Sequence, residues 1–545
     1  MLSSFTRKRS RSTNTPMDQF MDRRLGIHAL LLLACCSIAL SQTFPSDDPV
    51  IRRIWTEEMD STQLPSLAHE LFDVIGPRLV GSPGMLKANN WAVAKYRKWG
   101  IEAANQQFGT WRCWERGTTH IDLLFPRVRT LEGTMLAFSP GTRKGGVSAP
   151  LIVLADSPDS ASFQKWLPSV RGKFVLVSQP QPTGRPDRNW EEFGTKESFD
   201  SLKALRERIK GNWEHRLAAA NIKADSLPLV LEGAGAAGVI TSLWSAGWGS
   251  YRVFDTRATK VPAVALSLED YNLLFRLVEY GDNPEVRIEA SSKSLDPVPV
   301  YNTVGTMPGG EKPGEFVMLS AHFDSWDASS GATDNGTGTL VMMEAMRILK
   351  KCYPAPRRTI MVGHWGSEEQ GLNGSRAFVK DHPEIVGHLQ ALFNQDNGTG
   401  RVQTMSGAGL LNAAEHLGRW LSRIPHEVTQ NIKVDFPGMP AGGGTDHSSF
   451  DAAGAPGFGL GSLNWDYFSY TWHTNRDTYD KLVFDDLKNN VVLAACLAYL
   501  ASEDPQFITR ERRAMPAEGG TGKLQEWPQV REPKREGGMN DVKEK

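Results

Sequence analysis

The chain has 545 residues, of which 40% are hydrophobic and 23% charged, and its formal net charge is -1. Because a single hydrophobic core seldom grows beyond about 250–300 residues, this length predicts at least two domains. The balanced charge argues against a nucleic acid or an anionic membrane as a partner. The composition therefore indicates an ordinary globular protein with a small or neutral partner.

The N-terminal residues have the pattern of an export signal. Arg23 and Arg24 precede a hydrophobic run over residues 25–40, and Ala39 and Ser41 are small residues at the spacing of a signal-peptidase site. The run has about 16 residues, whereas a membrane-spanning helix needs ~20. We therefore expect a cleaved signal and no stable membrane span in the mature protein.

We expect residues 1–41 to be removed, so that the mature protein begins near Gln42 and lies in the periplasm or outside the cell. A lipoprotein anchor at Cys35 is disfavoured, because hydrophobic sequence continues past it. Three asparagines lie in N-x-S/T sequons close in sequence to the ionisable residues described below as a candidate site: Asn335, Asn373 and Asn397. A glycan on these asparagines would obstruct that site, so a bacterial exported protein is favoured.

Removal of the signal leaves three widely spaced cysteines, Cys113, Cys352 and Cys496. They can form one disulfide at most, and no CxxC pair indicates a cysteine zinc site. Any metal must therefore be bound by His, Asp and Glu.

Changes in hydrophobic pattern and composition divide the rest of the chain into four parts. Helical patterns on both sides of the turn-rich "GPRLVGSPG" occupy residues 45–140. Short β-branched runs, with one charged helix near 200–220, fill 141–294 and predict a separate strand-rich module. Strands alternate with helices over 295–505, which is typical of an α/β domain with a largely parallel sheet. Residues 506–545 contain few apolar residues and are expected to be disordered.

"GAGAAG", residues 233–238, matches a dinucleotide-binding fingerprint, but the strand-like "VITSLW" follows it where that fingerprint requires a helix. We interpret it as a tight turn. The sequence contains no GxSxG, HExxH or Walker motif, which removes the usual serine-hydrolase, zincin and nucleotidase interpretations.

Three predicted strands lead directly into ionisable residues. "EFVMLSA" is followed by His322 and Asp324, "TIMVGHW" by Glu368 and Glu369, and "LQALFNQ" by Asp396. Ligands of open α/β sheets gather at the carboxyl ends of the strands, so we expect these side chains to converge.

Two further residues join this set. Asp334 lies in "GATDNGTG" just before a helix, where on its own it would be interpreted as a helix N-cap. His473 follows an aromatic run in "TWHTNRDTYD", and alone it would be an ordinary histidine. Together the candidates comprise two imidazoles and three carboxylates, which suit two Zn²⁺ ions sharing one carboxylate: His322, Asp334, Glu369, Asp396 and His473.

The adjacent glutamates have different predicted roles, because two neighbouring side chains cannot face the same metal. Glu369 is the expected ligand. Glu368 is the expected base, which takes a proton from the water between the ions and passes it to a leaving amine. Asp324 is expected to accept the second N–H of His322 with its carboxylate and so to fix the histidine tautomer.

At "AHFDS", "GATDNGTG", "GSEEQGLNGS", "FNQDNG" and "HTNRDT" the sequence resembles the M28 family of metallopeptidases, which are co-catalytic zinc exopeptidases. The resemblance covers roughly residues 50–130 and 295–505. It implies a three-layer α/β zinc-exopeptidase fold with a mixed, largely parallel sheet, Asp334 as the ligand that bridges the metals, and short peptides as substrates. The module between these regions resembles a β-rich protease-associated (PA) domain.

The resemblance leaves alternatives open. Trp472 stands where some family members carry a tyrosine that assists the oxyanion. We expect an aminopeptidase or dipeptidase, and a carboxypeptidase of the same family remains an alternative. A one-zinc acyltransferase like glutaminyl cyclase and a non-catalytic protein like the transferrin receptor are the other two. "AGGGTDHSSF" resembles a family stretch near the substrate pocket, but Asp446 and His447 receive no role.

Overall fold

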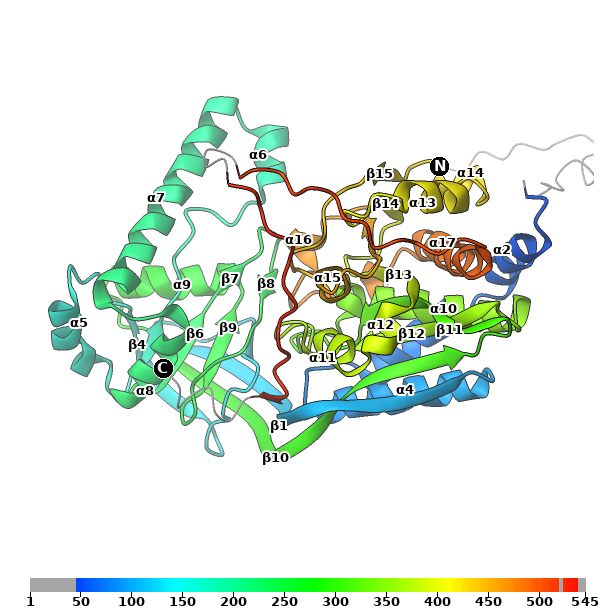
Figure 1. Ribbon diagram of the computed structural model, residues 1–545. Coiled ribbons are helices and arrows are strands. Elements are labelled where there is room, and N and C mark those ends of the chain that lie inside the picture. Colours follow the sequence, from blue (N-terminus) through cyan, green and yellow to red (C-terminus); the bar gives the residue numbers. More distant parts are fainter. Residues whose placement is uncertain (1–45, 519–522, 538–545) are drawn as a thin grey trace, which may run out of the picture. The chain divides into compact units, whose positions relative to one another are not determined.

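The computed structural model describes residues 46–518 and 523–537 (Figure 1). The predicted signal peptide lies outside them. Among the residues described, we find no helix with the length and hydrophobicity needed to cross a bilayer.

The central sheet is mixed and largely parallel, as predicted. β11 pairs in parallel with β12 on one side and with β13 on the other, and β13 pairs in parallel with β16. β10 runs antiparallel to β12, and β1 antiparallel to β10. The strands in spatial order are β15 (Lys433–Asp435), β14 (Val402–Ser406), β16 (Gly457–Ser462), β13 (Leu389–Gln395), β11 (Lys312–His322), β12 (Arg358–Trp365), β10 (Glu285–Met307) and β1 (Glu102–Phe125).

Helices cover both faces of this sheet and make the third layer. Every residue of β12 and β13 is buried, as is typical of parallel strands covered on both sides. One face packs against α10 and α17, while Trp365 of β12 and Leu392 of β13 pack on the other face against α11 and α15. The principal helices are α2 (Pro49–Ser61), α4 (Pro83–Lys98), α10 (Thr337–Cys352), α11 (Asn373–Asp381), α15 (His447–Ala452) and α17 (Phe484–Glu503).

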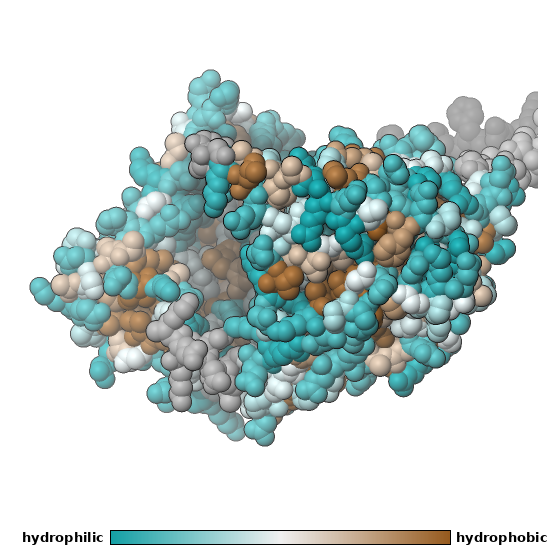
Figure 2. All heavy atoms as spheres, in the orientation of Figure 1, coloured by the Kyte–Doolittle hydropathy of each residue, from teal (hydrophilic) through white to brown (hydrophobic). Residues whose placement is uncertain are grey.

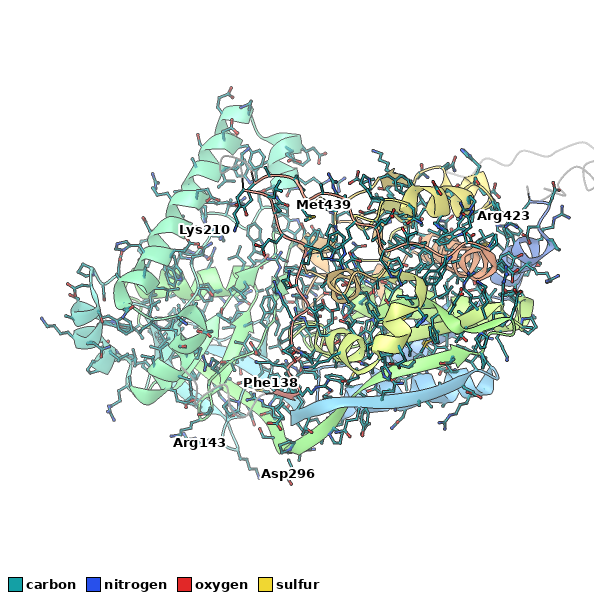
Figure 3. The ribbon with its side chains drawn as sticks, in the orientation of Figure 1. Phe138, Arg143, Lys210, Asp296, Arg423 and Met439 are labelled. Carbon is teal, nitrogen blue, oxygen red and sulfur yellow. The ribbon has the colours of Figure 1, made fainter. Side chains whose placement is uncertain are left out.

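The inserted module contains more helix than its strand-rich texture suggested. Its strands β4, β5, β6 and β9 pair in parallel, and helices join β4 to β5 and β5 to β6. α7 alone has 25 residues, and Lys210, labelled in Figure 3, is one of its exposed residues. The elements are β3 (Gly133–Met135), β4 (Val147–Val153), α5 (Ser160–Trp166), β5 (Phe174–Leu176), α7 (Lys196–Ala220), α8 (Leu227–Gly233), β6 (Gly238–Thr241), β9 (Ala263–Leu266) and α9 (Leu268–Glu279). "GAGAAG" is the turn between α8 and β6.

The predicted module, residues 141–294, shares its sheet and its hydrophobic core with residues that precede it. β1 and β10 are long strands that pair with each other over most of their length, from the central sheet into the module. Leu131 and Met135 belong to the same hydrophobic core as Val175 of β5. Residues before 141, such as Trp114 and Leu131, therefore share this core, and the sheet is continuous through both parts, which composition alone could not reveal.

The C-terminal segment, predicted to be disordered, is ordered over 506–518 and 523–537, which we call the strap. Ile508 is fully buried, and the Trp527 indole donates to the Asp451 carbonyl at 2.8 Å. Figure 1 shows the red segment crossing α15 and α11 to reach β1, where β17 (Glu536–Gly537) pairs with it in parallel. A few well-placed apolar side chains and backbone hydrogen bonds hold a segment whose average composition is polar.

The α2–α10 contact generates a prediction about pH. Glu58 on α2 is fully buried, and burial, reinforced by the charge of Glu344, raises its pKa to about 8 from an ordinary value of 4.5. Since the folded state holds this proton more tightly than the unfolded state does, the free energy of unfolding should fall as pH rises from about 4.5 to 8.

We expect Glu58→Gln to raise the melting temperature at pH 9 by several degrees, from a gain on the order of 3 kcal/mol, and to change it little at pH 5. Thermal melts at both pH values measure this. The control Glu57→Gln should destabilise instead, because Glu57 accepts from Arg347 at 2.6 Å. An equal effect of Glu58→Gln at both pH values would contradict the assignment.

Candidate metal centre

The candidate site lies at the carboxyl edge of three adjacent parallel strands. His322 is the last residue of β11, Asp396 immediately follows β13, and Glu369 lies four residues beyond the end of β12. Asp334 precedes α10, and His473 follows the short helix α16 (Tyr467–Tyr470). The sheet topology thus brings together segments that are far apart in the chain.

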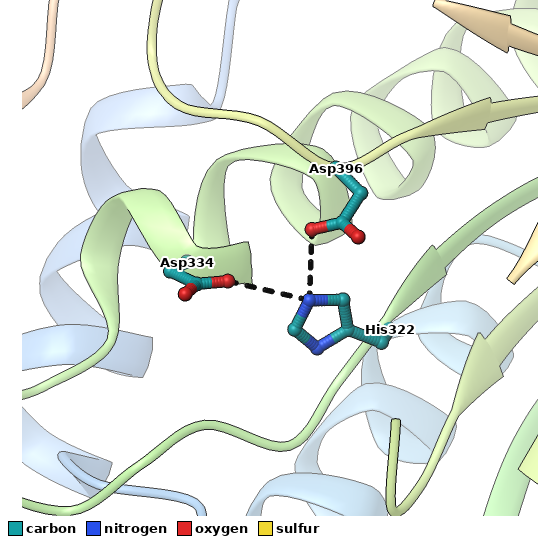
Figure 4. A group of neighbouring side chains, drawn as sticks. All are labelled: His322, Asp334 and Asp396. Atoms are coloured by element: carbon teal, nitrogen blue, oxygen red, sulfur yellow. Dashed lines mark hydrogen bonds and ion pairs between the residues drawn. The ribbon is translucent and has the colours of Figure 1, made fainter. Parts of the chain in front are cut away.

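His322, Asp334 and Asp396 form the first of two groups of ligand atoms (Figure 4). His322 Nε2 lies 2.9 Å from Asp396 Oδ1 and 3.4 Å from Asp334 Oδ1. One nitrogen and two carboxylate oxygens therefore point into a common space.

The second group contains Asp334, Glu369 and His473. His473 Nε2 lies 2.9 Å from Glu369 Oε2 and 3.2 Å from Asp334 Oδ2. Asp334 is shared, with one carboxylate oxygen in each group. Such a carboxylate can bridge two cations.

The carboxylates gathered at this site favour the binding of a cation. Burial lowers the pKa of His473, but the carboxylates of Glu369 and Asp334 outweigh burial and raise it to about 10. Burial and the charge of Asp334 raise the pKa of Glu369 to about 7. Glu369 Oε1 is buried and lacks a hydrogen-bond partner among the described residues. The oxygens and imidazoles thus fit divalent metal ions, and zinc accepts both ligand types.

Glu368 stands apart from both groups. Burial raises its pKa well above the usual range, and the nearby charges of Asp396 and Asp446 act in the same direction. Its backbone amide donates to Asp324 Oδ1 at 3.0 Å, and that of Glu369 donates to Asp324 Oδ2 at 3.3 Å. One carboxylate thereby fixes the turn from which the two glutamates diverge.

The expected role of Asp324 was therefore wrong in its detail. His322 Nδ1 lies 3.0 Å from the backbone carbonyl of Asp324 but 3.8 Å from its carboxylate. Because β11 ends at His322, the alternation of a strand no longer determines where Asp324 points. The residue still fixes the histidine, through its main chain.

Arg78, in "GPRLVGSPG", was missed by sequence reasoning. Its fully buried guanidinium donates to the carbonyls of Phe323 at 2.7 Å, Ser330 at 2.7 Å and Gly331 at 2.8 Å. It ties together both ends of the loop between His322 and Asp334. Its partners are carbonyl groups about 250 residues away, which no local pattern indicates.

Asp477 was also missed. Its carboxylate accepts from the backbone amides of Thr333 at 2.8 Å and Asp334 at 3.0 Å. It thereby fixes the main chain of the shared carboxylate. The sequence feature that could have indicated its role is its position four residues after His473, within the motif "HTNRDT".

Aromatic rings from both parts of the chain surround the His473 imidazole. Trp472 stacks on it with the ring centres 4.0 Å apart, and Phe254 and Trp326 meet it edge-on at 5.1 and 6.2 Å. The His473 carbonyl also accepts from the Val253 amide at 2.9 Å. The inserted module therefore helps to position a residue of the site.

Two cavities adjoin the site. One of about 340 Å³ includes Asp396 and has the apolar side chains of Met405, Met439 (labelled in Figure 3) and Leu460 in its wall. Another, of about 300 Å³, is lined in part by Trp465, Tyr467 and Tyr470, from the aromatic run before His473, and by Thr333. Both cavities can accept side chains next to the candidate metal centre.

Comparisons with known proteins agree with this arrangement. The family model "Peptidase family M28" matches residues 302–497. Mouse carboxypeptidase Q is 26% identical over 442 residues, which cover 81% of this chain and 86% of that protein.

Solved structures share the fold. The peptidase M28 precursor from Shewanella amazonensis matches with a TM-score of 0.62 and 23% identity, over 86% of this chain and 98% of that one. BSAP, a zinc aminopeptidase from Bacillus subtilis, matches with a TM-score of 0.52 and 19% identity, over 85% and 97%. Residues 302–497 thus match the M28 family of metallopeptidases, and the solved structures agree with that match in fold.

Proposed function

We propose that the protein is an exported di-zinc exopeptidase that hydrolyses short peptides, as an aminopeptidase or a dipeptidase. The observation that carries this proposal is the pair of ligand groups that share Asp334. A carboxypeptidase is the second candidate, because relatives with that name align along 81% of the chain.

His322, Asp334 and Asp396 would hold one zinc ion, and Asp334, Glu369 and His473 the other. When bound, the two ions supply Lewis acidity, which lowers the pKa of water and polarises the scissile carbonyl. The one-zinc and non-catalytic alternatives are disfavoured, because each ligand group is complete and its atoms already lie close together.

Glu368 would act as the base and then as the acid. It would take the proton of the attacking water and deliver it to the nitrogen of the leaving amine. Asp324 is a positioning residue in this scheme, because it holds the amides of Glu368 and Glu369. Arg78 and Asp477 would support it by fixing the loop that carries Asp334.

The inserted module would be a PA-like domain that limits the length of the peptides admitted. Supporting this, its Phe254 and Val253 contact His473 directly. A tetrapeptide cleaved as fast as the matching octapeptide would overturn this role.

Export would place the enzyme in the periplasm or outside the cell. We expect the mature chain to begin near Gln42, because Ala39 and Ser41 have the spacing of a cleavage site. Mass spectrometry of the protein secreted or exported by a bacterial host measures its N-terminus. A retained Arg23 in the exported chain would contradict cleavage there.

Metal content tests the ligand assignment. Wild-type protein dialysed after zinc loading should retain two zinc ions per chain, His473→Ala one, and Asp334→Ala fewer than either, since Asp334 contributes to both groups. Elemental analysis by mass spectrometry gives these values. Asp485→Asn, an exposed residue of α17, is the matched control and should keep both ions. Full retention by Asp334→Ala would exclude it as a bridge.

Turnover tests the base. Glu368→Gln should keep both zinc ions but lower kcat on leucyl-leucine by about 10²–10⁴-fold, because the proton carrier is lost. The exposed Glu384→Gln is the control. N-acetylation of the substrate should abolish chelator-sensitive cleavage if the free amine is recognised. Near-normal kcat in Glu368→Gln would remove Glu368 from this role.

A further inference from the structure

The cavity of about 340 Å³ opens directly onto the candidate metal centre, because Asp396 forms part of its wall. α15 contributes His447 and Asp451, which lie four residues apart and so share one side of the helix. Met405 and Met439 make another part of the wall apolar. A group that enters this cavity therefore lies beside one of the proposed zinc ligands.

Three glycines of β16 leave room for the cavity. Gly457, Gly459 and Gly461 alternate along the strand, so they share one face of the sheet, and all three line the cavity. A Cβ atom on Gly457 would lie 2.5 Å from Asp451 Oδ1, and one on Gly459 would lie 2.9 Å from the His447 ring. The sequence "GFGLGS" thus keeps open the space in front of these two side chains of α15.

Asp451 is a buried carboxylate with one oxygen unused. The residue is 1% exposed, and its Oδ2 accepts from the Ala441 amide at 2.8 Å. Its Oδ1 has no hydrogen-bond partner among the residues that the structure describes. Burial raises the pKa of Asp451 well above its usual range, and the amides of Ala441 and Gly457 oppose this shift only in part. A buried oxygen of this kind is costly unless a ligand supplies a donor.

The wall of the cavity is acidic. Asp435, on β15, is a second carboxylate in it and is exposed. Within the described part of the chain, no lysine or arginine lines the cavity. Burial lowers the pKa of His447 to about 4, so this imidazole is neutral near pH 7 and adds no positive charge. The cavity therefore favours a cationic ligand.

We propose that this cavity binds the side chain of a lysine or arginine residue next to the scissile bond, with Asp451 and Asp435 receiving its cationic group. The inference rests on the proposed function and deepens it: the preferred substrates are short peptides with a basic residue beside the bond that is cut. The two methionines would contact the methylene groups, and the carboxylates would accept from the ammonium or guanidinium.

Other side chains fit this cavity less well. An acidic side chain would be repelled by Asp451 and Asp435. A purely apolar side chain would fit between the methionines, but it would leave Asp451 Oδ1 buried without a donor. A site built to receive a hydrogen-bond donor discriminates against a ligand that lacks one.

The test uses two matched pairs of dipeptides on the zinc-loaded full chain: lysyl-leucine with norleucyl-leucine, and leucyl-lysine with leucyl-norleucine. Norleucine has a straight apolar side chain without the ammonium group, so each pair isolates the charge. Wild-type enzyme should prefer lysine over norleucine by about tenfold or more in kcat/KM in one pair. The pair that shows the preference identifies the side of the scissile bond that the cavity serves.

Variants then assign the preference to residues. Asp451→Asn should lower kcat/KM for the preferred lysine peptide by about tenfold, mainly through KM, and leave the norleucine peptide within about threefold. Its amide oxygen can still accept from the Ala441 amide, which preserves the fold. Asp435→Asn should reduce the preference by a smaller factor. The exposed Asp485→Asn is the matched control and should behave as wild type.

The outcomes separate the two proposals. Equal kcat/KM for lysine and norleucine in both wild-type pairs, or an unchanged preference in Asp451→Asn, would overturn the basic pocket and leave the peptidase proposal intact. If Asp451→Asn melts early, Asp435→Asn decides in its place, because Asp435 is exposed and its loss should not unfold the protein. Failure of the zinc-loaded wild type to cleave any peptide would overturn the proposed function and, with it, this inference.

Discussion

The crowding of negative charge at one sheet edge is the constraint on which the rest of the structure depends. Asp334, Glu369 and Asp396 converge there with Glu368 nearby, and Asp334 is buried. Carboxylates taken out of water repel one another and must be held by fixed partners or neutralised by cations. Much of the surrounding architecture supplies fixed partners.

Those partners are mostly main-chain groups rather than opposite charges. Asp324 and Asp477 accept backbone amides and so hold the turns that carry the glutamates and Asp334. Arg78 donates to backbone carbonyls of the intervening loop. Among the residues described, the ligand oxygens form ion pairs only with the two histidines. Hydrophilic residues cover most of the face shown in Figure 2, and the hydrophobic residues there form small separate groups.

The sequence predicted what depends on local pattern. Strand "LQALFNQ" matches β13, and the residues after three parallel strands could be brought together by topology alone. What it missed depends on distant contacts. The sequence around Arg78 indicates only a turn, because its carbonyl partners are distant in the chain. The Asp324 carboxylate does not bind His322 as predicted, because β11 ends two residues before it.

The dependence on distant contacts also explains why the sequence did not predict the shared sheet of the module or the ordered strap. A strand such as β10 gives no compositional sign of the point where it leaves one sheet region for another. The strap looks polar because its anchors are few: Ile508, Trp527 and a set of arginines that donate to backbone carbonyls. Averages over 40 residues conceal such anchors.

The strap has a consequence for the order of assembly. Arg535 donates to the Phe108 carbonyl across 427 residues of chain, so this contact closes a loop that contains the entire candidate site. Contacts of such sequence separation form late, because the loop-closure entropy must be offset by structure already in place. The surface that the strap forms with α11 and α15 therefore cannot exist on a partly synthesised chain, and it is completed only after nearly all of the sequence has been made.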